Sequence, residues 1–118
     1  MAEPPRGQDW HNRLNGQGII VATANATPIG FMSLKPSQAY IDLAFILYSA
    51  RGRGVFRKLY EHIEALAVRE NCPRISVDAS IAARPAFEAV GFALISSENI
   101  ERGSETLKRF KMEKRLVG

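Results

Sequence analysis

Three arginines and two glycines are gathered within seven residues of the chain: Arg51, Gly52, Arg53, Gly54 and Arg57. An apolar run that ends just before them predicts a strand, and an amphipathic pattern just after them predicts a helix. The first amides of a helix have no intrahelical acceptor, and the helix dipole places partial positive charge there. Glycine permits positive φ and a close approach to the backbone, and arginine matches the geometry of phosphate. The turn is therefore predicted to bind phosphate or pyrophosphate.

Two common phosphate-binding motifs do not account for this turn. It lacks the Gly-Lys-Ser/Thr ending of a P-loop, and no third glycine stands at the offset that the dinucleotide-binding fingerprint needs. An Arg-Gly-Arg-Gly tetrapeptide also occurs in solvent-exposed tails. Its position between a buried strand and an amphipathic helix is what favours an anion site.

Two strands and one long helix are expected to hold the turn. Residues 40–47 are the most apolar stretch of the chain and fit a central strand covered on both faces. Residues 55–70 fit a helix that ends before Pro73. Its apolar stripe consists of Val55, Leu59, Ile63, Leu66 and Ala67. Together with a strand at 74–79 they predict a βαβ unit with parallel strands.

The remaining elements complete an α+β fold with a sheet of mixed direction. The expected elements are a hairpin of residues 18–23 and 29–34, a short helix over 84–90 ended by Gly91, and a closing antiparallel pair at 92–95 and 107–112. We expect residues 18–116 to form one domain. Residues 1–17 are predicted to be a poorly ordered or partly helical lead-in, because Trp10 and Leu14 have the i, i+4 spacing of a helical turn.

Composition narrows the function classes. A chain of 118 residues is long enough for one domain. Its net charge of +4 fits either an ordinary solvated surface or an anionic partner. Cys72 is the single cysteine, and His11 and His62 lie far apart, so neither a disulfide nor a metal site is expected. We found no signal-peptide pattern and no apolar run that could cross a membrane, so a cytoplasmic location is expected.

Two segments resemble motifs of the GNAT superfamily, the acetyl-CoA-dependent N-acyltransferases. Arg51-x-x-Gly54-x-Phe56 resembles the family's Arg/Gln-x-x-Gly-x-Gly/Ala motif, and residues 79–92, ending in Gly91-Phe92, resemble its late helix. Residues 110–114 are similar to the end of many small bacterial members. The resemblance runs from about residue 18 to residue 116. It implies a twisted, mostly antiparallel sheet around the βαβ unit.

The resemblance also implies a cosubstrate and a reaction. Acetyl-CoA would lie in a gap between the strands at 40–47 and 74–79, and an amine would attack its acetyl carbonyl directly in a ternary complex. The backbone of the first strand would bond the pantetheine arm, and the turn amides would hold the pyrophosphate. The residues expected to contact the cosubstrate are Phe45, Ile46, Leu47, Arg51, Gly52, Arg53, Gly54, Val55, Phe56, Arg57, Ser80 and Phe87.

The chain departs from the family pattern in several places. Phe56 stands where glycine or alanine is usual, and its ring is expected in the core or against the cosubstrate. Phe87 stands where many members have a tyrosine that protonates the departing thiolate, which leaves water or Tyr48 as substitutes. Ser80 replaces a common asparagine and is expected to cap the late helix or to touch the cosubstrate. The usual first strand and two helices are mostly missing, which fits a minimal member, a fragment or a homodimer.

Tyr40 and Asp42 are the candidates for the general base, because the two-residue period of a strand places them on one face near the expected acetyl group. Asp78 and Glu101 are weaker candidates. Three function classes remain: an acetyltransferase acting on a small-molecule or protein amine, a non-catalytic acyl-CoA-binding module, and a nucleic-acid-binding domain. The third is disfavoured because most aromatic residues lie in apolar runs, not among the basic ones.

Overall fold

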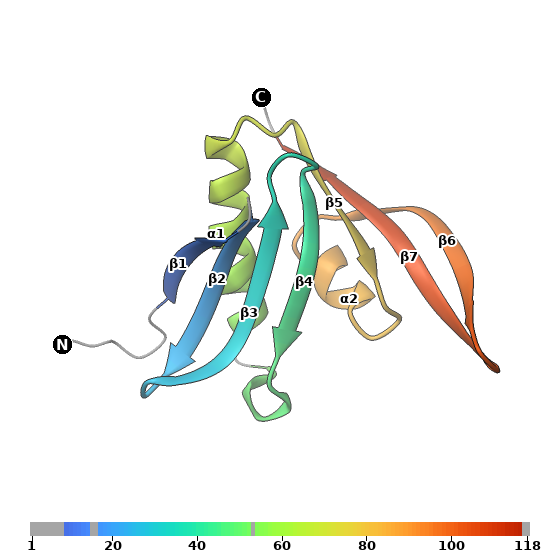
Figure 1. Cartoon of the computed structure of the whole chain (residues 1–118), viewed down its shortest axis with the longest axis horizontal. Helices are drawn as coiled ribbons and strands as arrows, with labels where there is room; N and C mark the ends of the chain where they lie inside the picture. Colours follow the sequence, from blue (N-terminus) through green and yellow to red (C-terminus); the bar gives the residue numbers. More distant parts are fainter. Residues whose placement is uncertain (1–8, 15–16, 53, 117–118) are drawn as a thin grey trace.

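The computed structural model describes residues 9–14, 17–52 and 54–116. Figure 1 shows a curved sheet with a long helix, α1, and a short helix, α2, on one of its faces. The elements in chain order are β1 (Asp9–Leu14), β2 (Gln17–Ala24), β3 (Thr27–Lys35), β4 (Tyr40–Ile46), a single 3-10 turn η1 (Tyr48–Ala50), α1 (Val55–Arg69), β5 (Arg74–Ala79), α2 (Arg84–Ala89), β6 (Ala93–Arg102) and β7 (Glu105–Arg115). The predicted α+β fold is confirmed.

Within the described residues, the strands form one sheet in the order β1-β2-β3-β4-β5-β7-β6. Each of β1, β2 and β3 pairs antiparallel with the strand that follows it in the chain. Strands β4 and β5 are parallel, and β7 lies between β5 and β6 and pairs antiparallel with both. The expected βαβ unit and the mostly antiparallel sheet are therefore present.

The helical turn predicted for Trp10 and Leu14 is wrong, because these residues belong to β1. Trp10 is paired with Val21 of β2, and Leu14 is paired with Gln17. Residues four apart share a face in a strand as well as in a helix, so the spacing did not distinguish the two. The backbone of β2 offers a pairing edge that this segment occupies.

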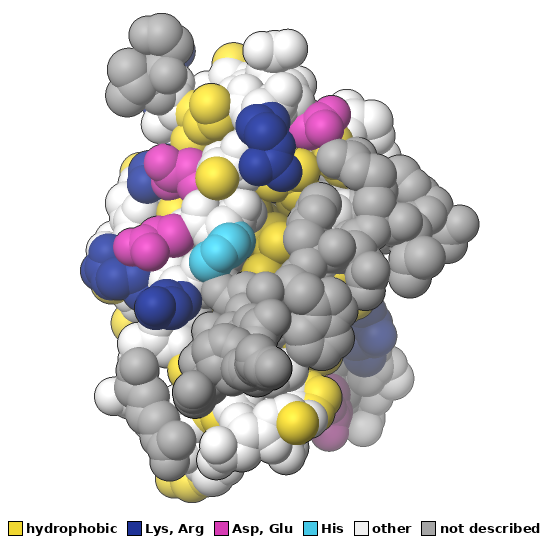
Figure 2. Space-filling view, turned by 90° about the vertical axis from the view of Figure 1, so that its left-hand side faces the viewer, with side chains coloured by type: hydrophobic (Ala, Val, Ile, Leu, Met, Phe, Trp, Pro, Cys, Tyr) yellow, Lys and Arg dark blue, Asp and Glu magenta, His cyan; other side chains and the backbone are white. Residues whose placement is uncertain are grey.

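The core lies between the sheet and α1. The helix buries Leu59, Tyr60, Ile63, Leu66 and Ala67 against β2 and β3, so the predicted stripe is confirmed with Tyr60 added and with Val55 only partly buried. The other side of α1 is exposed, and acidic and basic side chains are interspersed on that side of the molecule (Figure 2). This is the amphipathic pattern of a surface helix.

The prediction that the strand at 40–47 is covered on both faces is wrong for its second half. Leu43 is 51% exposed and Phe45 is 48% exposed. Continuous hydrophobicity does not distinguish a strand buried on both faces from one with an open apolar face. The second half of β4 therefore has an apolar face that is open to solvent.

Candidate functional site

The site begins where β4 and β5 diverge. They pair at only two positions, Tyr40 with Ser76 and Ile41 with Val77. Figure 1 shows the strands meeting at one end and separating toward their C-terminal ends, with α2 behind the gap. Among the described residues, no strand pairs with this edge of β4 beyond Ile41. The divergence expected from the family resemblance is thus present.

A β-bulge in β4 lies at the point of divergence. Ile41 is paired with Leu34 of β3, but the preceding residue Ser33 is paired with Leu43, so Asp42 is the inserted residue. The insertion reverses the alternation of side chains along the strand. Beyond the bulge, Ala44, Phe45 and Ile46 line the cleft, whereas Leu43 is exposed and does not line it.

The backbone of β4 offers hydrogen-bonding groups to the gap. The Leu47 amide donates to the Ile29 carbonyl at 2.8 Å, on the β3 side. Because an antiparallel strand turns every second residue toward the same neighbour, the backbone groups of Ala44 and Ile46 point away from β3 and into the gap. Of the three residues expected to bond a pantetheine arm, Leu47 therefore uses its amide within the sheet, Phe45 points its backbone toward β3, and Ile46 has the suitable direction.

The glycine-rich turn has the conformation that its sequence predicts. Gly52 and Gly54 have φ values of +80° and +77°, and Gly54 is the N-cap of α1. The Lys58 amide makes the first intrahelical bond, to the Gly54 carbonyl at 3.1 Å. The amides of residues 55–57 thus precede the intrahelical ladder, and among the described residues no side chain caps them. Arg53 lies outside the described residues.

A cleft of about 390 Å³ joins this turn to the edge of β4. Four small residues on the α2 side keep it open, namely Ser80, Ala82, Ala83 and Ala86. The Ser80 hydroxyl accepts a hydrogen bond from the Ala83 amide at 3.1 Å and so caps the turn before α2. The N-cap of α2 itself is Ala83, which has no side-chain cap. The complete lining is Ala44, Phe45, Ile46, Ala50, Arg51, Gly52, Gly54, Val55, Phe56, Ser80, Ala82, Ala83 and Ala86. The alanines were not singled out from the sequence, although their density between residues 79 and 89 is a usable signal.

Three of the residues expected to contact the cosubstrate do not line the cleft, namely Leu47, Arg57 and Phe87. Phe87 is buried in the core and does not line the cleft. Its ring packs edge-on against Phe56 and Phe92, with centroids 4.9 and 5.2 Å away. Phe56 packs against the core, as expected, and it also lines the cleft. Arg57 and Leu47 do not line the cleft either, and the Arg57 guanidinium donates to the Ala89 carbonyl at 3.2 Å.

The candidate bases lie on the face of the sheet away from α1. The Tyr40 hydroxyl donates to the Asp78 carboxylate at 2.9 Å. Burial, followed by this hydrogen bond and the charge of Asp78, raises the pKa of Tyr40 to about 12. Tyr40 is therefore protonated at neutral pH and is a poor base. Asp42 lies 4.0 Å from the Lys35 ammonium, and Glu101 is far along the β6–β7 hairpin.

The part of the chain that the structure describes contains no cluster of three or more histidine, cysteine or acidic side chains that could hold a metal ion. Its helices include none that is long and apolar enough to cross a membrane. Cys72 is buried, and burial followed by the charge of Glu70 raises the pKa of its thiol.

Comparison with known proteins decides the family. The model of the acetyltransferase (GNAT) domain matches residues 3–116. The chain belongs to the GNAT acetyltransferase family. It is 35% identical over 92 residues to the uncharacterised N-acetyltransferase YafP of Escherichia coli strain K12, an alignment that covers 78% of this chain and 57% of that protein.

Solved GNAT structures have the same fold. A GCN5-related N-acetyltransferase of Rhodopseudomonas palustris is 32% identical, with a TM-score of 0.79 over 87% of this chain and 64% of that one. A GNAT family acetyltransferase of Elizabethkingia anophelis with acetyl-CoA bound is 13% identical, with a TM-score of 0.71 over 86% of this chain and 77% of that one, and shows the fold alone. The chain thus spans less than two thirds of the E. coli and R. palustris proteins.

Proposed function

We propose that this GNAT chain transfers an acetyl group from acetyl-CoA to an amine acceptor by direct attack in a ternary complex. One observation carries the proposal: a single cleft joins the open edge of β4 to the first amides of α1. An extended thioester with a phosphorylated end needs both features, because one strand edge holds the arm and one helix N-terminus holds the phosphates.

Each part of acetyl-CoA has matching groups. The amides of residues 55–57, with Gly52 and Gly54 in the left-handed conformation, would hold the pyrophosphate. The backbone of Ala44 and Ile46 would bond the pantetheine arm, which runs past the alanines before α2. The acetyl group would then lie near the bulge at Asp42, where β4 and β5 separate.

The chemistry needs orientation and one proton acceptor. A base takes a proton from the ammonium, and the neutral amine nitrogen then bonds to the acetyl carbon. The carbon–sulfur bond breaks with its electron pair on sulfur, so coenzyme A leaves as the thiolate. We assign the base to Asp42, because it is the carboxylate at the point of divergence. Tyr40 holds its own proton at neutral pH and would instead keep Asp78 in place. The acceptor is a small-molecule or protein amine.

A second candidate function is an acyl-CoA-binding module without turnover. It is favoured by the cleft lining, which among the described residues contains no tyrosine, histidine or cysteine to protonate a leaving thiolate. Phe87, at the position where many relatives carry a tyrosine, is buried among other aromatic rings.

Two measurements separate these candidates. Thermal unfolding with rising acetyl-CoA should show stabilisation, since a ligand that binds only the folded state raises its stability. No shift at concentrations far above a micromolar Kd would overturn both functions. Release of free thiol in the presence of a panel of primary amines should then show turnover that Asp42→Asn reduces by about 10²- to 10⁴-fold. Binding without thiol release from any amine would favour the module.

A further inference from the structure

The short helix α2 forms one wall of the cleft but has little support of its own. It has six residues, Arg84–Ala89, far fewer than an isolated helix needs in water. The cleft is lined by Ser80, Ala82, Ala83 and Ala86, which lie just before α2 and in its first turn. The last turn of α2 contains no basic residue to complement the partial negative charge of its terminal carbonyls. Its position must therefore be secured from other elements.

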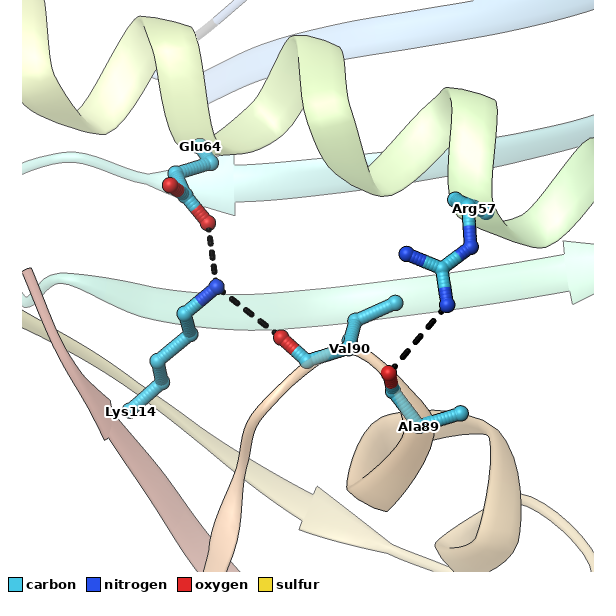
Figure 3. Close-up of polar contacts among 5 residues, drawn as sticks. All are labelled: Arg57, Glu64, Ala89, Val90 and Lys114. Atoms are coloured by element: carbon cyan, nitrogen blue, oxygen red, sulfur yellow. Dashed lines mark hydrogen bonds and ion pairs between the residues drawn. The ribbon is translucent and has the colours of Figure 1, made fainter.

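Two cationic side chains from other elements bind the C-terminal end of α2, as Figure 3 shows. Arg57, from the first turn of α1, donates to the Ala89 carbonyl at 3.2 Å. Lys114, from β7, donates to the Val90 carbonyl at 2.9 Å. Cations near a helix C-terminus are favourable, and these two donate to carbonyls for which the helix itself supplies no donor.

The Lys114 ammonium is held by contacts with α1 as well as with the end of α2. It forms an ion pair with Glu64 of α1 at 2.7 Å and lies 5.1 Å from the centre of the Tyr60 ring. Gly91 has a φ of +107°, and a Cβ at this position would lie 3.1 Å from Cε of Lys114. The glycine therefore leaves space for the lysine side chain as well as allowing the backbone to turn. Burial raises the pKa of Glu64, but the hydrogen bond from Lys114, the nearby Tyr60 hydroxyl and the lysine charge outweigh it and lower that pKa overall.

We propose that Arg57 and Lys114 form a clamp, a pair of positioning residues that hold α2 at the distance from β4 at which the cleft accepts the acyl-pantetheine arm. The inference rests on the proposed function, because that function identifies the ligand of the cleft. Arg57 connects the first turn of α1 with the end of α2. Its amide is among those proposed to hold the pyrophosphate, whereas its guanidinium contacts the wall of the cleft that faces the arm.

The test uses substitutions that remove each cation and keep most of the side-chain volume. Arg57→Met and Lys114→Met are compared with Lys58→Met and Lys111→Met, which remove the same charge at exposed positions on the same elements. Two readouts are needed. The first is hydrogen exchange of the amides that close α2, namely those of residues 87 and 90–92. The second is the ratio of the affinities for CoA and for 3′-phospho-ADP, which has the phosphates but lacks the arm.

If the clamp holds α2, these amides should exchange faster in both Arg57→Met and Lys114→Met. In the same two variants, the ratio of the affinity for CoA to the affinity for 3′-phospho-ADP should fall on the order of tenfold. Neither change is expected in the controls. Arg57→Lys, which keeps a cationic donor, should recover most of the ratio. If Arg57→Met weakens both ligands equally, its guanidinium acts on the phosphates and the proposal is wrong. Unchanged exchange in both variants would also overturn it.

Failure of this inference is distinguishable from failure of the proposed function. If the wild-type protein binds neither ligand, the proposed function falls, and with it the role assigned to the clamp. If the wild type binds CoA and the exchange rates do not change, only the clamp is refuted. Should Lys114→Met fail to fold, Arg57→Met carries the test, because Arg57 is exposed on the surface of α1.

Discussion

Replacing Gly54 by valine tests the phosphate turn directly. Gly54 has a φ of +77°, and a Cβ built on it meets no atom within 4 Å. The substitution is therefore expected to cause no clash with neighbouring atoms, and its cost lies in the backbone alone. An L-residue in the left-handed region loses roughly 1–2 kcal/mol, and a β-branched side chain is among the least tolerated there.

The expected effect on binding is larger than the effect on stability. A valine that relaxes toward negative φ rotates the amides of residues 55–57 away from the cleft, since Gly54 caps the helix to which they belong. A hydrogen bond to a charged group contributes about 1.5–3 kcal/mol, and each 1.4 kcal/mol corresponds to a factor of about ten in affinity. Losing one phosphate bond should therefore weaken CoA binding by about 10- to 100-fold.

The control is Gly103→Val in the β6–β7 turn. Gly103 has a φ of +60°, and its added Cβ also meets nothing within 4 Å, but it does not line the cleft. Both variants should lose a similar free energy of unfolding in urea titrations. Only Gly54→Val should lose affinity for CoA and for 3′-phospho-ADP in calorimetric titrations. If Gly54→Val keeps its CoA affinity within about twofold, the amides of this turn do not hold the phosphates.

Three further predictions concern the cleft and its surroundings. Ala86→Leu should fill part of the cleft and weaken CoA binding about tenfold or more in calorimetric titrations. The free energy of unfolding should change by less than about 1 kcal/mol, since Ala86 is only partly buried. Tyr40→Phe should lower the free energy of unfolding by about 1 kcal/mol and remove the tyrosinate absorbance step near pH 12. In the wild type, the hydrogen bond to Asp78 stabilises the folded state below pH 10, and this stabilisation is lost as pH rises toward 12. An absorbance step that is unchanged in the variant would contradict the assignment of the raised pKa to Tyr40. Glu64→Gln should have a lower free energy of unfolding than the wild type above pH 4.5, and this difference should vanish as pH falls through the lowered pKa of Glu64. A difference in free energy of unfolding that stays constant as the pH is lowered would show that the ion pair with Lys114 does not stabilise the fold.

Local patterns alone predict the turn and the elements beside it. Glycines at 52 and 54 predict positive φ because only glycine adopts it without strain, and both have it. The 3.6-residue stripe predicts α1 to within one residue at its end, because an amphipathic helix shows its buried face in its spacing. The parallel pairing of β4 with β5 follows from the helical crossover between them, which returns the chain to the same end of the sheet. The predicted phosphate turn depends on these local features.

Tertiary packing decided the rest of the cleft. The alternation within residues 40–47 cannot reveal a bulge, because the insertion at Asp42 is defined only by register against β3. Trp10 and Leu14 satisfy helix and strand spacing equally, and pairing with β2 selected the strand. Arg57 adjoins the phosphate turn in sequence, but its guanidinium reaches a carbonyl at residue 89, a contact that exists only once α2 packs beside α1. The sequence by itself therefore determined the conformation of the turn that is proposed to bind an anion. The tertiary structure decided the shape of the cleft beside it, because that shape depends on strand register and on contacts between residues far apart in the chain.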